Sequence, residues 1–190
     1  MPDHALKPLC ALGGAEPVSH QIGHLRISEN PGLAMASLSI RDEQDKTVAT
    51  AAAKLLGFTL PEPGGLARSG DWAAFWTGPG QWMLTAPFAS HEDIAGIVKT
   101  AVGAGASVTE QTDGWVRFEI EGPAVPTMLE RLCNADTTCM QAGQAVRSQI
   151  EHLGSFLLCH QAGTAFSIIT LRSGAASMMH ALETAAKAVC

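Results

Sequence analysis

Between residues 33 and 111, segments with strand and helix patterns follow one another in the order β-α-β-β-α-β. Residues 33–40 alternate as in a strand, and the apolar side chains of residues 45–58 recur on one face of a helix that ends before Gly57. The remaining elements of this stretch are aromatic-rich strands at 71–77 and 81–87, a helix that Ser90 caps, and a strand at 106–111. This order is typical of a ferredoxin-like split β-α-β unit.

A second series of elements begins after the turn at Asp113-Gly114. In the strand predicted within residues 114–122, apolar and charged residues alternate, so that Arg117 and Glu119 share one polar face. The other predicted elements are a helix from Pro123 with the stripe Val125, Met128, Leu129 and Leu132, strands at 144–152, 155–160 and 164–172, and a helix that Ser173 caps and that carries Met178, Met179, Leu182 and Val189. We therefore expect an α+β protein with two comparable halves.

The chain of 190 residues is long enough to bury a substantial core in one domain. Proline, glycine and histidine are scattered through residues 1–24, which predicts an irregular N-terminal arm. Residues 25–190 then form a single α+β domain whose halves span about 30–111 and 112–190.

Charge and hydropathy exclude several classes of protein. The formal net charge is −6, with 12 basic and 18 acidic residues and no local cluster of Lys or Arg, so no nucleic-acid partner is expected. Much of the 46% apolar content is alanine, and no apolar run of about 18 residues predicts a membrane span.

The first residues lack the pattern of a secretory signal, and five cysteines without a close-set framework suit reduced thiols. We expect a cytoplasmic protein.

The segment FWTGPGQWML, residues 75–84, is either a loop that cradles a cofactor or a turn between strands. Gly78-Pro79-Gly80-Gln81 fits a type II turn, because proline sets φ at its second position and Gly80 supplies the positive φ of its third. Phosphate-binding glycine motifs are followed by a helix, whereas a strand follows here. The sequence therefore predicts a turn.

Four tryptophans, at 72, 76, 82 and 115, need an environment for their large apolar rings. One interpretation places them in the core or at an interface, and the other makes them an aromatic wall that stacks a pterin or flavin ring. The first is favoured, since a pocket also needs converging polar groups. The candidates for core or interface are Trp72, Trp76, Trp82, Met178 and Met179.

A zinc site is conceivable from Cys133, Cys139, Cys159, His152 and His160. The spacing matches no zinc motif, and the adjacent Cys159 and His160 would face opposite sides of a strand, so buried free thiols are favoured. Neither a Gly-x-Ser-x-Gly elbow nor a protease-type cysteine is present, and paired acids fall on loops and a helix start. We find no catalytic constellation.

FWTGPGQWML, VTEQTDGWVRFEIEGPAVPTMLERLCNADT, GQAVRSQIEHLGSFLLCHQAGTAFSIITLRS and the closing amphipathic helix together resemble the gamma subunit of heterotetrameric sarcosine oxidase. The resemblance covers about residues 30–188. That family is similar to the folate-binding domain of glycine-cleavage T-proteins and of the tRNA-modifying GTPase. The resemblance thus implies a fold of duplicated, interleaved ferredoxin-like units.

The resemblance also implies a function, that of a non-catalytic gamma subunit with the alpha, beta and delta subunits as partners. Such a complex oxidatively demethylates sarcosine to glycine with formation of H2O2, and passes the one-carbon unit to tetrahydrofolate. FAD, FMN, NAD and tetrahydrofolate would be held by alpha and beta and zinc by delta, so this chain itself is expected to bind no cofactor. The acidic pair of T-proteins and the Lys-Gly-Cys motif of a related iron-sulphur repair protein have no counterpart here, so no functional residue is carried over. The alternatives are a stand-alone folate-binding or aminomethyltransferase-like module and, third, a small zinc protein.

Overall fold

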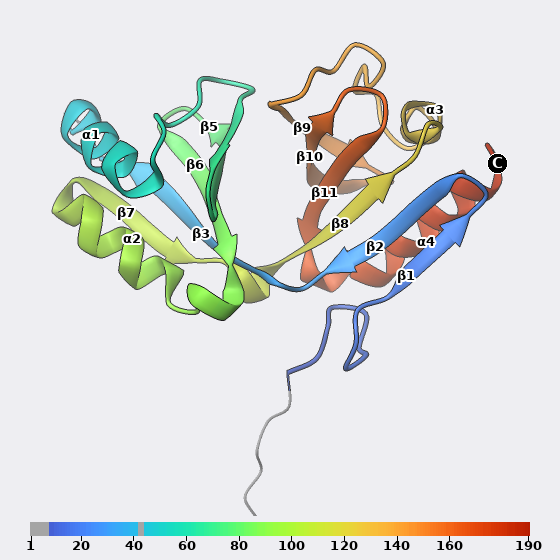
Figure 1. The fold of residues 1–190 in the computed structure, drawn as a ribbon, viewed down its shortest axis with the longest axis horizontal. Coiled ribbons are helices and arrows are strands. Elements are labelled where there is room, and N and C mark those ends of the chain that lie inside the picture. Colours follow the sequence, from blue (N-terminus) through green and yellow to red (C-terminus); the bar gives the residue numbers. More distant parts are fainter. Residues whose placement is uncertain (1–7, 42–43) are drawn as a thin grey trace, which may run out of the picture.

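The computed structural model describes residues 8–41 and 44–190. Its architecture is two antiparallel sheets that spread apart from a shared centre, with helices on their outer sides (Figure 1). The expected mixture of helices and strands is therefore confirmed, while the duplicated ferredoxin-like description of the halves stays a prediction. Residues 1–7 of the expected arm lie outside the described residues.

Sheet B holds the strands of the first half. Its five strands, in spatial order, are β4 (Leu66–Ser69), β5 (Trp72–Gly78), β6 (Gln81–Pro87), β3 (Leu33–Ile40) and β7 (Ala106–Glu110). Helices α1 (Asp45–Leu56) and α2 (Ile94–Val102) cover its outer face. The helices pack there because alternate residues of β3 and every fourth residue of α1 are apolar. These two apolar faces bury each other. The prolines and glycines of residues 60–70 favour a loop, but the structure places strand β4 within this segment.

Sheet A holds the strands of the second half and two more. Its six strands, in spatial order, are β1 (Ser19–Ile22), β2 (Leu25–Asn30), β8 (Trp115–Glu121), β11 (Ala165–Leu171), β10 (Leu153–Gln161) and β9 (Gln144–Ile150). Helices α3 (Val125–Leu129) and α4 (Ala175–Lys187) pack on its outer face. Short 3-10 helices lie at Phe88–Ser90, Gly103–Gly105, Thr112–Gly114 and Arg172–Gly174. In the described part of the chain, no helix is both long and apolar enough to span a membrane.

The N-terminal hairpin β1–β2 corrects the predicted boundaries. Residues 19–22 form a strand, so the expected irregular arm is irregular in its described part only up to about residue 18. β2 pairs with β8, because its alternating Leu25 and Ile27 are buried in the same core as Phe118. Residues 19–30 thus belong to the sheet of the second half, although they precede the first half in sequence.

The predicted caps of two helices are wrong. Ser90 lies in a 3-10 helix, and α2 is instead capped by Asp93, whose Oδ1 accepts a hydrogen bond from Gly96 N at 3.0 Å. Ser173 also lies in a 3-10 helix, and the residue directly before α4 is Gly174, which has no side chain to accept a hydrogen bond. Neither serine occupies the position directly before its helix, which is where a capping side chain lies.

A thin apolar layer joins the two sheets. It consists of Met35, Phe75 and Met83 from sheet B and Ala145, Phe156, Leu158 and Ile169 from sheet A. At one edge the sheets also share backbone hydrogen bonds, from Leu66 N to Gly143 O at 2.7 Å and from Ala145 N to Gly64 O at 2.8 Å. The faces that carry these residues are the inner faces of the two sheets.

The Gly-Pro-Gly segment is the predicted turn. It joins β5 to β6, Gly78 pairs with Gln81, and Gly80 has φ 64°, as the third position of a type II turn requires. The turn places Trp76 directly opposite Trp82.

Candidate functional site

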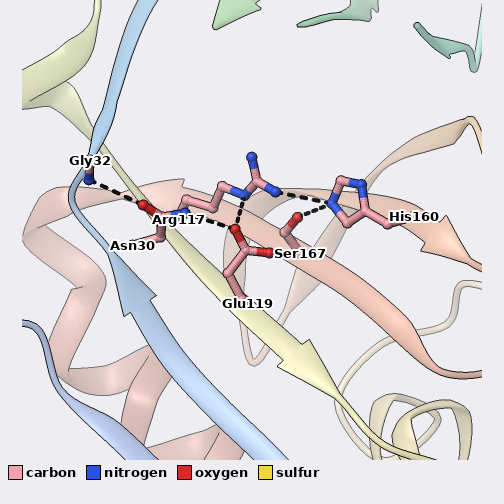
Figure 2. A network of polar contacts seen from close by, with 6 residues as sticks. All are labelled: Asn30, Gly32, Arg117, Glu119, His160 and Ser167. Carbon is pink, nitrogen blue, oxygen red and sulfur yellow. Dashed lines mark hydrogen bonds and ion pairs between the residues drawn. The ribbon is translucent and has the colours of Figure 1, made fainter. Parts of the chain in front are cut away.

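Polar side chains from four neighbouring strands meet on the inner face of sheet A (Figure 2). They are Asn30 of β2, Arg117 and Glu119 of β8, Ser167 of β11 and His160 of β10. We call these five residues the inner polar cluster.

Strand register brings the cluster together. Arg117 lies opposite Asn30, and Glu119 lies opposite Ser167, so the three strands present these side chains on one face. His160 follows Cys159, which faces the outer core, and therefore points to the inner side.

The carboxylate of Glu119 is the centre of the cluster. Its Oε1 accepts a hydrogen bond from Asn30 Nδ2 at 2.9 Å and lies 2.9 Å from Arg117 Nε. The arginine contact is an ion pair in which Nε does not point its hydrogen at the oxygen. Asn30 is oriented further by Gly32 N, which donates to its Oδ1 at 3.1 Å. The charge of Glu119 is thus compensated by a cation and an amide.

His160 is a neutral acceptor at the other end of the cluster. Its Nε2 lies 3.2 Å from the Nη2 of Arg117 and also contacts the hydroxyl of Ser167. Burial, and after it the charge of Arg117, lower the pKa of His160 from 6.5 to about 4. Near neutral pH the ring therefore accepts hydrogen bonds at Nε2, which assigns its proton to Nδ1.

The contact between Ser167 and His160 does not make a catalytic dyad. Ser167 is 0% exposed, so no substrate carbon reaches its hydroxyl. A histidine with a pKa of about 4 is also a poor general base near neutral pH. The contacts of the cluster hold the side chains of Arg117 and Asn30 in fixed orientations.

Arg117 and Asn30 also line a cavity of about 330 Å³ where the two sheets and the N-terminal arm meet. We call it the seam cavity, and its walls include Cys10, Phe88, Trp115 and Arg172. The indole of Trp115 donates from Nε1 to Gln111 Oε1 at 3.0 Å and so holds a fixed orientation. The volume lies at the lower end of the range for small-molecule sites.

A buried carboxylate holds the arm over this cavity. Glu29 is 4% exposed, and its two oxygens accept from Leu12 N at 3.2 Å and from Val18 N at 3.4 Å. Arg172 donates from Nη2 to Leu9 O, closer to the start of the described arm. The arm is thus anchored by charged groups at both ends.

The five residues proposed for core or interface do not form one site. Met178 and Met179 are 0% and 5% exposed in the core between α4 and sheet A. Trp72 is half-buried, with its ring edge-on to His91 at 4.7 Å between centroids. Trp76 and Trp82 line a groove on the outer side of sheet B.

The residues considered for zinc do not converge either. Cys159 is buried in the outer core, whereas His160 points to the inner face, as the strand alternation predicted. Within residues 8–41 and 44–190, no three His, Cys, Asp or Glu side chains are grouped so as to hold a metal ion. Burial raises the pKa of the thiols of Cys133 and Cys159, which are free.

The inner polar cluster was missed by the sequence analysis. Alternation placed Arg117 and Glu119 on one face, which was a correct but partial signal. Asn30, His160 and Ser167 gave none, because they meet Arg117 and Glu119 only through contacts between residues 43 to 89 positions apart in the chain.

Comparison with known proteins shows the fold. No protein-family model matches the chain, and no curated protein sequence matches it. A chain of the heterotetrameric sarcosine oxidase from Corynebacterium sp. U-96, solved in complex with pyrrole 2-carboxylate, is similar with a TM-score of 0.77 and 19% identity, over 90% of this chain and 87% of that chain. The glycine cleavage system aminomethyltransferase T from Bartonella henselae is similar with a TM-score of 0.57 and 13% identity, over 84% of this chain and 45% of that chain. This chain thus spans less than half of that aminomethyltransferase. It has the fold that a sarcosine oxidase chain shares with aminomethyltransferase T.

Proposed function

We propose that this chain is a non-catalytic subunit of a sarcosine oxidase complex, in the position of the gamma subunit. The observation that carries the proposal is the similarity to one chain of a heterotetrameric sarcosine oxidase, which extends over nearly all of both chains. The two chains therefore agree in size as well as in fold. In this proposal FAD, FMN, NAD, tetrahydrofolate and zinc are held by the alpha, beta and delta subunits.

An apolar surface at the seam supports a subunit role. Large apolar side chains are exposed at Leu9 (54%), Phe88 (39%) and Leu171 (49%). Leu9 and Phe88 line the seam cavity, and Leu171 pairs with Trp115, which lines it too. Exposed apolar side chains that gather in one place are typical of a contact with another protein. We call Leu9, Phe88 and Leu171 the seam patch.

Co-expression tests this proposal. The tagged chain is produced together with the sarcosine oxidase alpha, beta and delta subunits encoded beside it, and the purified material is assayed for sarcosine-dependent H2O2 formation. We expect the four chains to co-purify as an active complex. Recovery of the tagged chain alone, as a monomer, would contradict the proposal.

A pair of variants tests the seam patch within that complex. Leu171→Glu should reduce co-purification, because it buries a charge in the contact. Ile97→Glu is the matched control, since Ile97 is also an exposed apolar residue (36%) but lies on α2 and does not line the seam cavity. Equal co-purification of both variants would show that the contact lies elsewhere.

A second candidate function is a stand-alone folate-binding or aminomethyltransferase-like module. The seam cavity favours it, because Trp115 offers a ring to stack on, and Arg117 and Arg172 offer cations for the carboxylates of a folate. Titration calorimetry of the isolated chain with tetrahydrofolate decides this point. Saturable micromolar binding that Trp115→Leu abolishes would favour the module over the subunit.

A further inference from the structure

A second hollow lies on the outer side of sheet B, and its lining residues differ in kind from those of the seam cavity. It is a groove of about 690 Å³ between helix α1, the loop at residues 59–63 and the tip of the β5–β6 hairpin. We call it the indole groove, because Trp76 and Trp82 line it. It lies on the face opposite the seam cavity, since these two residues alternate with Phe75 and Met83 of the inner face.

The walls of the groove are fixed by hydrogen bonds. Trp82 Nε1 donates to Pro61 O at 2.8 Å, which ties the loop to the strand. Ile40 N donates to Gly80 O at 2.9 Å, which ties the hairpin tip to the end of β3. The helix contributes Ala49 and Ala53 at this point, and their short side chains leave the space between helix and hairpin open.

The two indoles are available to a ligand. Trp76 and Trp82 lie directly opposite each other on neighbouring strands, on the side of the groove. The other two indoles already have aromatic partners, since Trp72 packs on His91 and Trp115 on Phe156. Trp76 and Trp82 form no such pair among the described residues. Trp82 packs in part against the core under α1. Both indoles are only partly buried and line the groove, so their exposed parts are open to a ligand.

The charged residues that line the groove are acidic. Asp45 and Glu62 line it, and the part of the chain that the structure describes adds no Lys, Arg or His to the lining. Aromatic faces attract cations through the ring quadrupole, most strongly for tryptophan, and nearby carboxylates add to the attraction. These two carboxylates would repel an anionic ligand, and no cation among the described lining residues would offset that repulsion.

We propose that the indole groove binds a small organic cation that carries an alkylated ammonium group. Alkyl groups on the nitrogen bury apolar area against the indoles and reduce the hydration that a bare ammonium would lose. The proposal assigns this chain a ligand site of its own, and it stands independently of the subunit role.

A matched pair of ligands tests the charge. Choline and 3,3-dimethylbutan-1-ol have the same shape, but only choline carries a positive charge. The full chain labelled with ¹⁵N shows one indole N–H resonance for each tryptophan, and Trp76→Leu and Trp82→Phe assign the two that matter. We expect choline to shift these two resonances saturably, with an affinity about tenfold higher than that of the alcohol. Sodium chloride at equal ionic strength is the salt control.

Three results would overturn the proposal. They are equal shifts with the neutral alcohol, equal shifts at Trp72 and Trp115, and no saturable shift with choline up to about 100 mM. The ligand comparison is made on the unmodified chain, so it does not depend on whether a variant folds.

A charge variant tests the role of the Glu62 carboxylate. Glu62→Gln should weaken choline binding several-fold, because it removes a negative charge without changing shape. Glu121→Gln removes the same charge from an exposed position on sheet A and should leave the binding unchanged. Equal affinities of both variants and the unmodified chain would show that Glu62 does not attract the ligand.

Discussion

The Nε2 of His160 lies 3.2 Å from the Nη2 of Arg117, although strand β11 separates their two strands. The cation approaches a histidine that is already buried, and both effects oppose protonation of the ring. The contact is stable only while the histidine is neutral, so the inner polar cluster is sensitive to acid.

The first prediction concerns stability against pH. The pKa of His160 is about 4 in the folded chain, against an ordinary 6.5 when unfolded. Between these values the unfolded chain binds a proton that the folded chain does not, so stability should fall as the pH falls from about 6.5 to about 4. The loss should be on the order of 2 kcal/mol, less than the full shift implies, because the ring is not fully shielded from water.

Urea unfolding at about pH 7 and about pH 5 measures this loss. His160→Gln should make the stability less dependent on pH, whereas the control His180→Gln, at an exposed position of α4, should not. Titration of the His160 ring with a pKa near its ordinary value, as seen by NMR, would refute the prediction.

Local and non-local features of this fold differ in how far the sequence predicts them. Strand β3 was predicted with its observed bounds, because its alternation is written in consecutive residues. The pairing of β2 with β8 was missed, since nothing in residues 25–30 specifies a partner about 90 residues away. The inner polar cluster depends on that pairing and was missed with it. Its charged pair, Arg117 and Glu119, was predicted only as one polar face of a strand.

The second prediction concerns the apolar layer between the sheets. Phe156 is 5% exposed, and its ring lies 5.2 Å from that of Phe75 and 5.6 Å from that of Trp115, between centroids. Phe156→Ala should lower the free energy of unfolding by about 3–5 kcal/mol, because it leaves a cavity where the sheets meet. Phe88→Ala, at a 39% exposed position, should cost less than about 1 kcal/mol. Chemical denaturation compares the two, and equal losses would show that the layer does not join the sheets.

The third prediction concerns the N-terminal arm. In Glu29→Gln, an NH2 group would replace one of the two oxygens that accept from Leu12 N and Val18 N, so one donor would face another. We expect a loss of about 1–3 kcal/mol in the anchoring of the arm. Hydrogen exchange should show faster exchange at Leu12 and Val18, and proteolysis should cut the arm sooner. Glu16→Gln, on the exposed part of the arm, is the control, and equal exchange in both variants would contradict the anchoring role.

The fourth prediction separates backbone strain from steric conflict at two glycines. Gly80 has φ 64° and open space around it, so Gly80→Ala should cost only the strain of a left-handed residue, about 1–2 kcal/mol. Gly122 has φ 134°, and a Cβ there would lie 2.2 Å from the carbonyl oxygen of His24, in the turn between β1 and β2. Gly122→Ala must therefore push the N-terminal hairpin away from the end of β8, and we expect it to cost more than about 3 kcal/mol. Thermal unfolding of the two variants side by side measures the difference. Equal melting temperatures would mean that the hairpin does not hold its position against Gly122, and would place the pairing of β2 with β8 in doubt.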